Sequence, residues 1–524
     1  MVTSTLQIRP PLAPQKEFAQ VADFLRASGA SVNIQGDATA VLTGVALDSR
    51  LVMPGDLWIA VQGLTHHGAQ HWQQAVERGC AGVVADEIGA ELLSHMNVDI
   101  PVIAVVGATT WVGPLSAWFY DRPGESLYTV GVTGTNGKTS MTHFLVATWS
   151  ALSAAPAACI GTLGVRVYSG AAVENTATGF TTPEAPVLHA CLETLRQRKV
   201  ANVALEISSH ALTLGRVDGF CVDLAIFTNL SHDHLDFHAD MQDYFEAKTI
   251  LFTQSHSRQA LVCVDEPWGQ RLAQSLREQG RSVVTYGATQ GDYRMTGFGA
   301  GTCTVEHGGM STTFAFNSPG EFNAVNATGT FAALILQGVP RESVIAAMSA
   351  VSQVPGRMEV VSTVGQPLTV IDYAHSPDSV ERVLEALRTQ TQGTLIAVLG
   401  AGGDRDVLKR PHMGMAALKA GVDVIVITDD NPRSEAPAVI RAAVRADIDT
   451  LIAAGVTPVE VHEIGDRSEA VAFAIALAAP DDTVAVLGKG AETGQHIGDV
   501  VLPFDDRDVA RACLTTWIEP GRAR

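Results

Sequence analysis

A glycine-rich segment that ends in a lysine and a threonine offers the clearest chemistry in this sequence. It lies between an apolar run at 126–130 and a segment at 141–149 that is predicted to be helical, and it reads Gly134, Thr135, Asn136, Gly137, Lys138 and Thr139. A strand, a glycine turn and a helix N-terminus together make a phosphate-binding loop, because the turn directs backbone N–H groups toward an anion. Lys138 would reach the terminal phosphates, and the Thr139 hydroxyl could take a Mg²⁺ position. Val132 stands where the strict pattern has its first glycine, so an ordinary βα turn stays open as an alternative.

Carboxylate and imidazole side chains follow two later apolar runs. Glu206 comes after the run 203–205, and three histidines and two aspartates lie within 232–238. Such a cluster suggests a metal. The sequence lacks the thiol and H-E-x-x-H patterns of zinc sites, and Mg²⁺, which takes few protein ligands together with phosphate oxygens and waters, fits better. A solvated polar loop explains the same composition, and Lys248, in a predicted helix, reads on its own as a surface lysine.

Composition limits the classes of function. A chain of 524 residues is expected to form two to four domains, and 46% apolar with 17% charged residues is typical of globular proteins. A net charge of −20 argues against a nucleic-acid-binding groove. No apolar run is long enough to span a bilayer, the N-terminus has no signal pattern, and the seven cysteines form no C-x-x-C pair. We therefore expect a cytoplasmic protein without a membrane span or a nucleic-acid partner.

Apolar strands alternate with amphipathic helices along most of the chain, which predicts an α/β fold with a mostly parallel sheet. A small α/β unit precedes the glycine loop, and residues 1 to about 15 are expected to be loosely held. A second alternating unit begins near 355–357. Three of its predicted strands run into glycine or charged residues at 400–406, 429–433 and 488–492. Ligands bind beyond the carboxyl ends of strands in such sheets, so a second ligand site is expected there.

The motifs, taken together, resemble those of the Mur ligases, the ATP-dependent enzymes that add amino acids to the peptidoglycan precursor. The resemblance rests on Gly-Thr-Asn-Gly-Lys-Thr at 134–139, Glu-Ile-Ser-Ser-His at 206–210 and Asn-Leu-Ser-His-Asp-His-Leu-Asp at 229–236, and it covers essentially the whole chain. Folylpolyglutamate synthetases usually have glycine where Thr139 stands, and cyanophycin synthetases carry a further large region. The resemblance implies an N-terminal uridine-nucleotide domain (1–125), a central ATP-binding domain (126–355) and a Rossmann-like amino-acid domain (356–524).

The resemblance also implies an active site. Its catalytic residues would be Lys138, Glu206, His234 and Lys248, and Thr139, Glu206, His234 and Lys248 would serve Mg²⁺. In the family, the lysine that corresponds to Lys248 is carbamylated by CO₂. The carbamate turns a cation into an anion that can face a metal. Beyond the glycine loop, ATP contacts are implied for Asn323, Asn326, Arg357 and Asp372.

Two substrates are implied as well. UDP-N-acetylmuramoyl-L-alanyl-D-glutamate would contact Leu47, Ser49, Leu64, Thr65, His66, Thr181, Thr182, Ser208 and Arg216. Diaminopimelate would contact Arg405, Asp430, Asn431, Pro432, Arg433, Gly488 and Glu492. Only diaminopimelate, and not lysine, carries a distal carboxylate, and the Arg433 guanidinium suits a bidentate pair with it.

Three positions depart from relatives in the family. Phe180 stands where an Asn can occur, Leu214 where a Gln can occur, and Ala491 where a His is usual. The expected protein is a monomeric ligase of cell-wall synthesis, with consequences for cell shape and division. A lysine-adding ligase and a catalytically silent Mur-like binding subunit remain alternatives.

Overall fold

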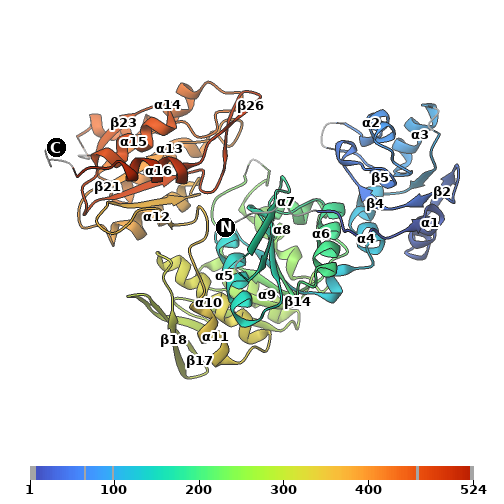
Figure 1. Cartoon of the computed structure of the whole chain (residues 1–524), viewed down its shortest axis with the longest axis horizontal. Coiled ribbons are helices and arrows are strands. Elements are labelled where there is room, and N and C mark those ends of the chain that lie inside the picture. The colour runs from blue at the N-terminus through green and yellow to red at the C-terminus, as the bar shows by residue number, and fades with distance from the viewer. Residues whose placement is uncertain are drawn as a thin grey trace.

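The computed structural model describes residues 8–63, 66–96, 99–170, 172–235, 237–455 and 459–519. Three α/β domains follow one another along the chain, and the central one lies between the other two (Figure 1). This confirms the predicted α/β class and the parallel central sheet. Among the described residues, no helix is both long and apolar enough to cross a membrane.

The N-terminal domain has a five-stranded sheet in the order β2-β7-β6-β5-β4. Its strands are β2 (Val32–Gln35), β4 (Gly44–Ala46), β5 (Asp56–Ala60), β6 (Gly82–Ala85) and β7 (Val102–Val105), with a separate pair β1 (Lys16–Glu17) and β3 (Val41–Leu42). Its helices are α1 (Phe18–Ala27), α2 (Trp72–Glu77), α3 (Glu87–His95) and α4 (Ala108–Phe119). The expectation of a loosely held start is wrong at Arg9, which forms two hydrogen bonds of 2.7 and 2.6 Å with the Asp56 carboxylate.

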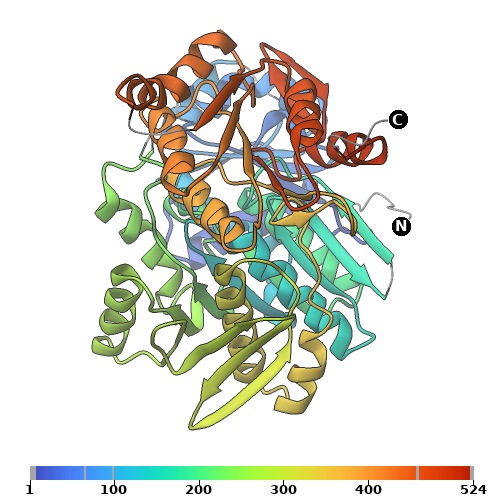
Figure 2. The same cartoon turned by 90° about the vertical axis from the view of Figure 1, so that its left-hand side faces the viewer.

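The central domain has an eleven-stranded sheet in the order β11-β10-β9-β12-β8-β13-β14-β15-β16-β17-β18. The strands are β8 (Tyr128–Thr133), β9 (Ala157–Gly161), β10 (Gly164–Ser169), β11 (Ala172–Thr176), β12 (Asn202–Glu206), β13 (Val222–Phe227), β14 (Ser257–Cys263), β15 (Val283–Gly287), β16 (Tyr293–Gly299), β17 (Thr302–His307) and β18 (Met310–Ala315). The helices are α5 (Lys138–Leu152), α6 (Ala185–Gln197), α7 (Ser209–Thr213), α8 (Met241–Thr249), α9 (Pro267–Glu278), α10 (Glu321–Leu336) and α11 (Arg341–Met348). In this sheet order, neighbouring strands from β9 through β12, β8, β13, β14 and β15 to β16 run parallel. The strands β16–β18 project as an antiparallel extension, seen at the bottom of Figure 2.

Two apolar cores cover the two faces of the central sheet. One contains Phe144 of α5 and Phe331 of α10, and the other contains Leu188 of α6, Phe245 of α8 and Leu272 of α9. Because helices bury both faces, β8 and its neighbours read as continuous apolar runs rather than alternating ones. The glycine loop therefore leaves the middle of a rigid sheet.

The C-terminal domain has a six-stranded sheet in the order β19-β20-β24-β21-β22-β23, parallel except for β19. The strands are β19 (Glu359–Val360), β20 (Leu368–Asp372), β21 (Leu395–Leu399), β22 (Val424–Ile427), β23 (Glu460–Glu463) and β24 (Thr483–Leu487), with the hairpin β25 (Gly494–Ile497) and β26 (Val500–Pro503). The helices are α12 (Pro377–Arg388), α13 (Lys409–Lys419), α14 (Pro437–Ala453), α15 (Arg467–Leu477) and α16 (Asp506–Thr515). The three strands predicted to end at ligand-binding loops are β21, β22 and β24, which lie side by side.

Candidate active site

The glycine loop joins β8 to α5, and its geometry requires glycine at two positions. Gly134 has φ +148°, and a Cβ there would lie 1.9 Å from the Thr228 hydroxyl. Gly137 has φ +86° and faces the Asn326 amide, 2.9 Å from the position of an added Cβ. Lys138 opens α5, and its Nζ donates hydrogen bonds of 2.8 Å to the carbonyl oxygens of Gly134 and Thr135. The loop thus presents a helix N-terminus and an ammonium group at one point.

Glu206, at the end of β12, lies beside this loop and is 2% exposed. Its carboxylate accepts hydrogen bonds from the Thr139 hydroxyl at 2.9 Å, the Thr162 hydroxyl at 3.0 Å and the Thr162 backbone N–H at 3.0 Å. Gly161 leaves room for it, since a Cβ there would come within 2.1 Å of Glu206 Oε1. Sequence reasoning missed Thr162; the only signal was its place in a Gly-Thr pair after β9.

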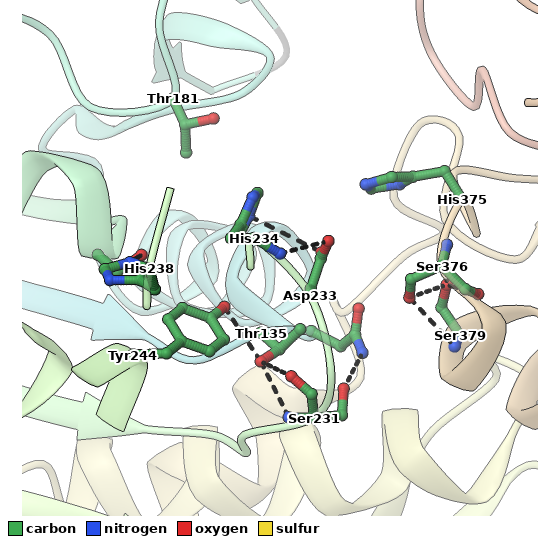
Figure 3. Close-up of polar contacts among 12 residues, drawn as sticks. Thr135, Thr181, Ser231, Asp233, His234, His238, Tyr244, His375, Ser376 and Ser379 are labelled. Atoms are coloured by element: carbon green, nitrogen blue, oxygen red, sulfur yellow. Dashed lines mark hydrogen bonds and ion pairs between the residues drawn. The ribbon is translucent and has the colours of Figure 1, made fainter. Parts of the chain in front are cut away.

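Lys248, on α8, is 1% exposed, which excludes a surface lysine. Its Nζ donates to the Gly134 carbonyl at 3.0 Å and lies 4.3 Å from the centre of the Tyr244 ring. Burial lowers the pKa of Lys248 well below its usual value, and the neighbouring Lys138 ammonium lowers it further. The Tyr244 hydroxyl in turn lies 3.2 Å from the Thr135 hydroxyl, as Figure 3 shows. The Lys248 amine is therefore held against the phosphate loop.

His234 lies in the loop after β13, at φ +56°, next to Asp233 (Figure 3). Its backbone N–H donates to the Asp233 carboxylate at 2.9 Å, and its ring nitrogen is 3.8 Å from that carboxylate. Burial lowers the pKa of His234 to about 3, although Asp233 acts in the opposite direction. A neutral imidazole is the form that binds metal.

The four residues expected to serve Mg²⁺ do not form one set of mutual contacts. Thr139 and Glu206 are hydrogen-bonded, whereas Lys248 contacts Gly134 and His234 contacts Asp233. Within the described part of the chain, no group of three His, Cys, Asp or Glu side chains is arranged to hold a metal ion. The donors that do meet, two hydroxyls and a carboxylate, are of the oxygen class that Mg²⁺ prefers.

The C-terminal domain reaches the glycine loop through Arg357. Its guanidinium donates to the Thr139 hydroxyl at 3.2 Å and lies 4.2 Å from the centre of the Tyr373 ring. The Asn136 amide also donates to the Asp378 carboxylate of α12 at 3.3 Å. These contacts place the last domain directly over the loop.

The other two proposed ATP contacts on this side are engaged within the protein. Both oxygens of the buried Asp372 carboxylate accept backbone N–H groups, of Met358 and Ala374, at 2.7 Å. The Asn323 amide donates to the Pro319 carbonyl at 2.8 Å, and its buried Oδ1 has no partner in the described structure.

Four of the residues expected to bind the sugar-peptide form one network on the other side of Glu206. The Thr182 hydroxyl donates to the Glu206 carbonyl at 2.8 Å and accepts from the Ser208 N–H at 3.0 Å. Arg216 donates to the Thr182 carbonyl at 3.1 Å, and the Thr181 hydroxyl is 3.1 Å from that of Thr162.

The expected uridine-nucleotide residues lie apart from these, in the N-terminal domain. The Leu47 carbonyl accepts from the Trp58 indole at 3.2 Å, the Ser49 hydroxyl donates to Gln74 at 2.8 Å, and His66 is exposed. Leu64 and Thr65 lie outside the described residues.

In the C-terminal domain, the expected amino-acid residues gather at the ends of β21, β22 and β24. The Arg433 guanidinium donates to the Gly403 carbonyl at 2.5 Å, and the side chains of Arg433 and Arg405 flank Gly402. Pro432 packs against Gly403, where an added Cβ would lie 1.9 Å from its carbonyl oxygen.

A residue that sequence reasoning missed lies at the centre of this group. Lys489 is fully buried, and its Nζ donates to Asn431 and to Glu492, both at 2.9 Å. Asn431 also donates to Glu492 at 3.0 Å, while Gly488 leaves space for the Asp430 carboxylate, 2.5 Å from the position of an added Cβ. The Lys489 ammonium thus holds the Glu492 carboxylate, which was expected to contact diaminopimelate. The signal for Lys489 in the sequence was the Gly-Lys-Gly run at 488–490.

Known proteins resemble this chain over nearly its full length. Residues 132–334 match the family model of the Mur ligase middle domain, and residues 356–490 match that of the Mur ligase glutamate ligase domain. The UDP-N-acetylmuramoyl-L-alanyl-D-glutamate--2,6-diaminopimelate ligase of Streptomyces coelicolor is 41% identical over 97% of this chain and 98% of its own length. The protein of the same name from Corynebacterium glutamicum is 40% identical over 94% of this chain and 95% of its own.

Solved structures agree with the sequence relatives. A structure of a ligase with this name matches 96% of this chain and 99% of its own, with a TM-score of 0.64 and 28% identity. A folylpolyglutamate synthase from Mycobacterium tuberculosis complexed with ADP shares the fold at 18% identity and a TM-score of 0.59, covering 73% of this chain and 92% of its own. The likeness to the relatives extends over nearly the full length, and the chain belongs to the Mur ligase family.

Proposed function

We propose that this chain joins diaminopimelate to the D-glutamyl carboxylate of UDP-N-acetylmuramoyl-L-alanyl-D-glutamate, with ATP as the energy source, in the cytoplasm and as a monomer. The observation that carries the proposal is the meeting of three elements at Thr139. The glycine loop supplies Thr139 itself, β12 supplies Glu206 at 2.9 Å, and the last domain supplies Arg357 at 3.2 Å. The names of the relatives support the choice of substrates.

ATP is proposed to bind with its phosphates on the loop Gly134–Thr139. Lys138 would exchange its two loop carbonyls for phosphate oxygens, and Arg357 would add a second cation from the last domain. Asn326, beside Gly137, and Asn323 lie on the helix expected to face the nucleotide base, and Asp372 keeps the turn that carries Arg357 in place. Charge that develops on the phosphates in the transition state would thereby meet preorganised cations.

Mg²⁺ fits the oxygen donors around Glu206. Thr139 and Glu206 would hold the ion, together with His234 and a modified Lys248. A bound Mg²⁺ would offset phosphate charge and orient the transferred group. The protein's own part is to keep Glu206 fixed through Thr162 and to bury the site.

Lys248 is proposed to carry a carbamate derived from CO₂. Lys138 and Lys248 both lie against the carbonyl of Gly134 in a buried setting, which disfavours two positive charges and lowers the pKa of Lys248, so that its neutral amine can react with CO₂. A carbamate would replace one of them with an anion. Its oxygens would accept hydrogen bonds and face the metal where an ammonium would repel it.

The substrates are proposed to enter from opposite domains. Residues 1–125 would bind the uridine nucleotide through Leu47, Ser49 and His66, with Leu64 and Thr65, and the network around Thr182 would hold the peptide end. Residues 126–355 would hold ATP, and residues 356–524 would hold diaminopimelate. Arg433 and Arg405 would pair with its distal carboxylate, and the polar group formed by Asp430, Asn431, Gly488 and Glu492 with Lys489 would shape the rest of the pocket.

The reaction follows from this arrangement. The D-glutamyl carboxylate attacks the γ-phosphate of ATP, the β–γ bridge breaks, and ADP leaves. The amine of diaminopimelate then attacks the resulting acyl phosphate, and phosphate is released as the amide forms. Contacts such as Arg357–Thr139 keep the last domain over the site, which excludes the water that would hydrolyse the acyl phosphate.

The test is phosphate release by the purified chain with ATP and Mg²⁺. Release should require both the nucleotide dipeptide and diaminopimelate, and leaving out either should abolish it. Release at the same rate without the amino acid would show an ATPase instead. No release with the full set would show a silent binding protein.

A further inference from the structure

Phe180 is an exposed aromatic residue that covers a buried charge. It lies in the loop between β11 and α6 and is 51% exposed. Its ring centre is 4.4 Å from the guanidinium carbon of Arg216, which is within cation–π range. The loop is fixed locally, because the Thr178 hydroxyl donates to the Phe180 carbonyl at 3.0 Å. The ring is therefore held over a cation at the surface and is not part of the core.

Arg216 is otherwise restrained from within the protein. One terminal nitrogen is 2.8 Å from the Glu184 carboxylate, and the other donates to the Thr182 carbonyl at 3.1 Å. Its side chain is 11% exposed, and its buried Nε has no hydrogen-bond partner in the described structure. Phe180 covers one face of the guanidinium plane, so the ring and the two acceptors together set the direction of its free donors.

We propose that Phe180 is a positioning residue for the nucleotide substrate. Its ring holds the Arg216 guanidinium toward that substrate. The inference rests on the proposed function, because it assigns a substrate contact at the same site. It does not involve ATP or the amino acid.

The experiment compares Phe180→Leu and Phe180→Tyr with the wild-type enzyme, measuring kcat and the KM of each substrate separately. Leucine keeps apolar bulk but lacks the π face, whereas tyrosine keeps it. Phe180→Leu should raise the KM for the nucleotide dipeptide roughly three- to tenfold, the range of a partly desolvated cation–π contact. The kcat and the KM values for ATP and diaminopimelate should not change, and Phe180→Tyr should stay within about twofold of wild type by the same reasoning. Phe298→Leu, a change of an exposed ring on β16, is the matched control and should have no effect.

The outcomes separate this inference from the proposed function. If the wild-type enzyme turns over and Phe180→Leu has the same KM for the nucleotide dipeptide, the inference alone is overturned. So would equal losses in Phe180→Leu and Phe180→Tyr, or a rise in the KM for ATP as large as that for the nucleotide dipeptide. A wild-type enzyme that does not use the nucleotide dipeptide would overturn the proposed function and the inference with it.

Discussion

Removing the Arg357 side chain should impair turnover without unfolding the protein. Arg357 is half-buried and spans two domains: besides a bond to the adjacent Gly356 carbonyl, it makes one charged hydrogen bond to the central domain, to Thr139, and one ring contact, to Tyr373. A hydrogen bond from a charged donor is worth about 1.5–3 kcal/mol and a surface cation–π contact about 0.5–1 kcal/mol. Arg357→Ala should therefore cost about 2–4 kcal/mol, or a roughly thirty- to thousandfold fall in kcat/KM for ATP.

The assay is steady-state phosphate release with ATP varied and the other substrates saturating. Arg382→Ala is the matched control, because Arg382 also bridges the domains, to Glu266 at 2.5 Å, is 39% exposed, and has Asp378 at 3.1 Å, not Thr139, as its other partner. An exposed pair is worth up to about 1 kcal/mol, so this change should cost roughly fivefold at most. Equal losses in the two variants would show that Arg357 acts only by docking the domains. Near-normal kcat/KM in Arg357→Ala would refute the assignment.

Four further predictions concern other charged side chains. Lys138→Ala should abolish turnover while the thermal unfolding profile stays unchanged, and near-normal activity would end the phosphate-loop assignment. Lys248→Ala should be nearly inactive and partly recover with added acetate or formate, which supply the missing anion; an active wild-type structure with an unmodified amine would contradict this. Arg433→Ala should lose about 2–5 kcal/mol, hence roughly thirtyfold or more in kcat/KM for diaminopimelate. The low kcat/KM for lysine should be the same in Arg433→Ala as in the wild-type enzyme, and an equal loss for both amino acids would argue against a role of Arg433 in selectivity. Asp506→Asn should lower the free energy of unfolding by about 3–5 kcal/mol in denaturant titrations, because it removes the negative charge that pairs with the fully buried Arg467 guanidinium. Asp508→Asn, 78% exposed, is its control, and equal stability in the two would contradict the reasoning.

Elements with a strong local pattern were predictable. The run 126–130 before the glycine loop became β8, and the three strands predicted to run into 400–406, 429–433 and 488–492 became β21, β22 and β24, because buried parallel strands are continuously apolar. The helix carrying Lys248 was expected too, but not its burial, which depends on Gly134 and Tyr244, more than a hundred residues and four residues away respectively.

Elements with weak or misleading local signals were missed. The strands β9, β10 and β11 are short and rich in Ala, Gly and polar residues, and they become a sheet edge only by pairing with β12. Helix α4 contains Pro114, which reads as a helix breaker, yet its apolar side is buried in the N-terminal core. Tertiary packing outweighs local propensity in both cases.

The contacts within the site could not be read from the chain for a similar reason. The motifs indicated Glu206, Thr139 and Arg357 separately, but the contacts among them depend on how three domains sit together. Thr162 has only a Gly-Thr pair and Lys489 only a Gly-Lys-Gly run as a local signal, and their roles follow from which carboxylate each one meets. Residue type indicated the chemistry, and long-range packing decided the partners.

The most direct test of the account is a competition between diaminopimelate and lysine. Purified enzyme would receive ATP, Mg²⁺ and UDP-N-acetylmuramoyl-L-alanyl-D-glutamate with equal concentrations of the two amino acids, and mass spectrometry would identify the nucleotide product. The account predicts that the product carries diaminopimelate almost exclusively, with one ADP and one phosphate formed for each amide bond. A product that carries lysine, or ADP formation without any amide product, would contradict it.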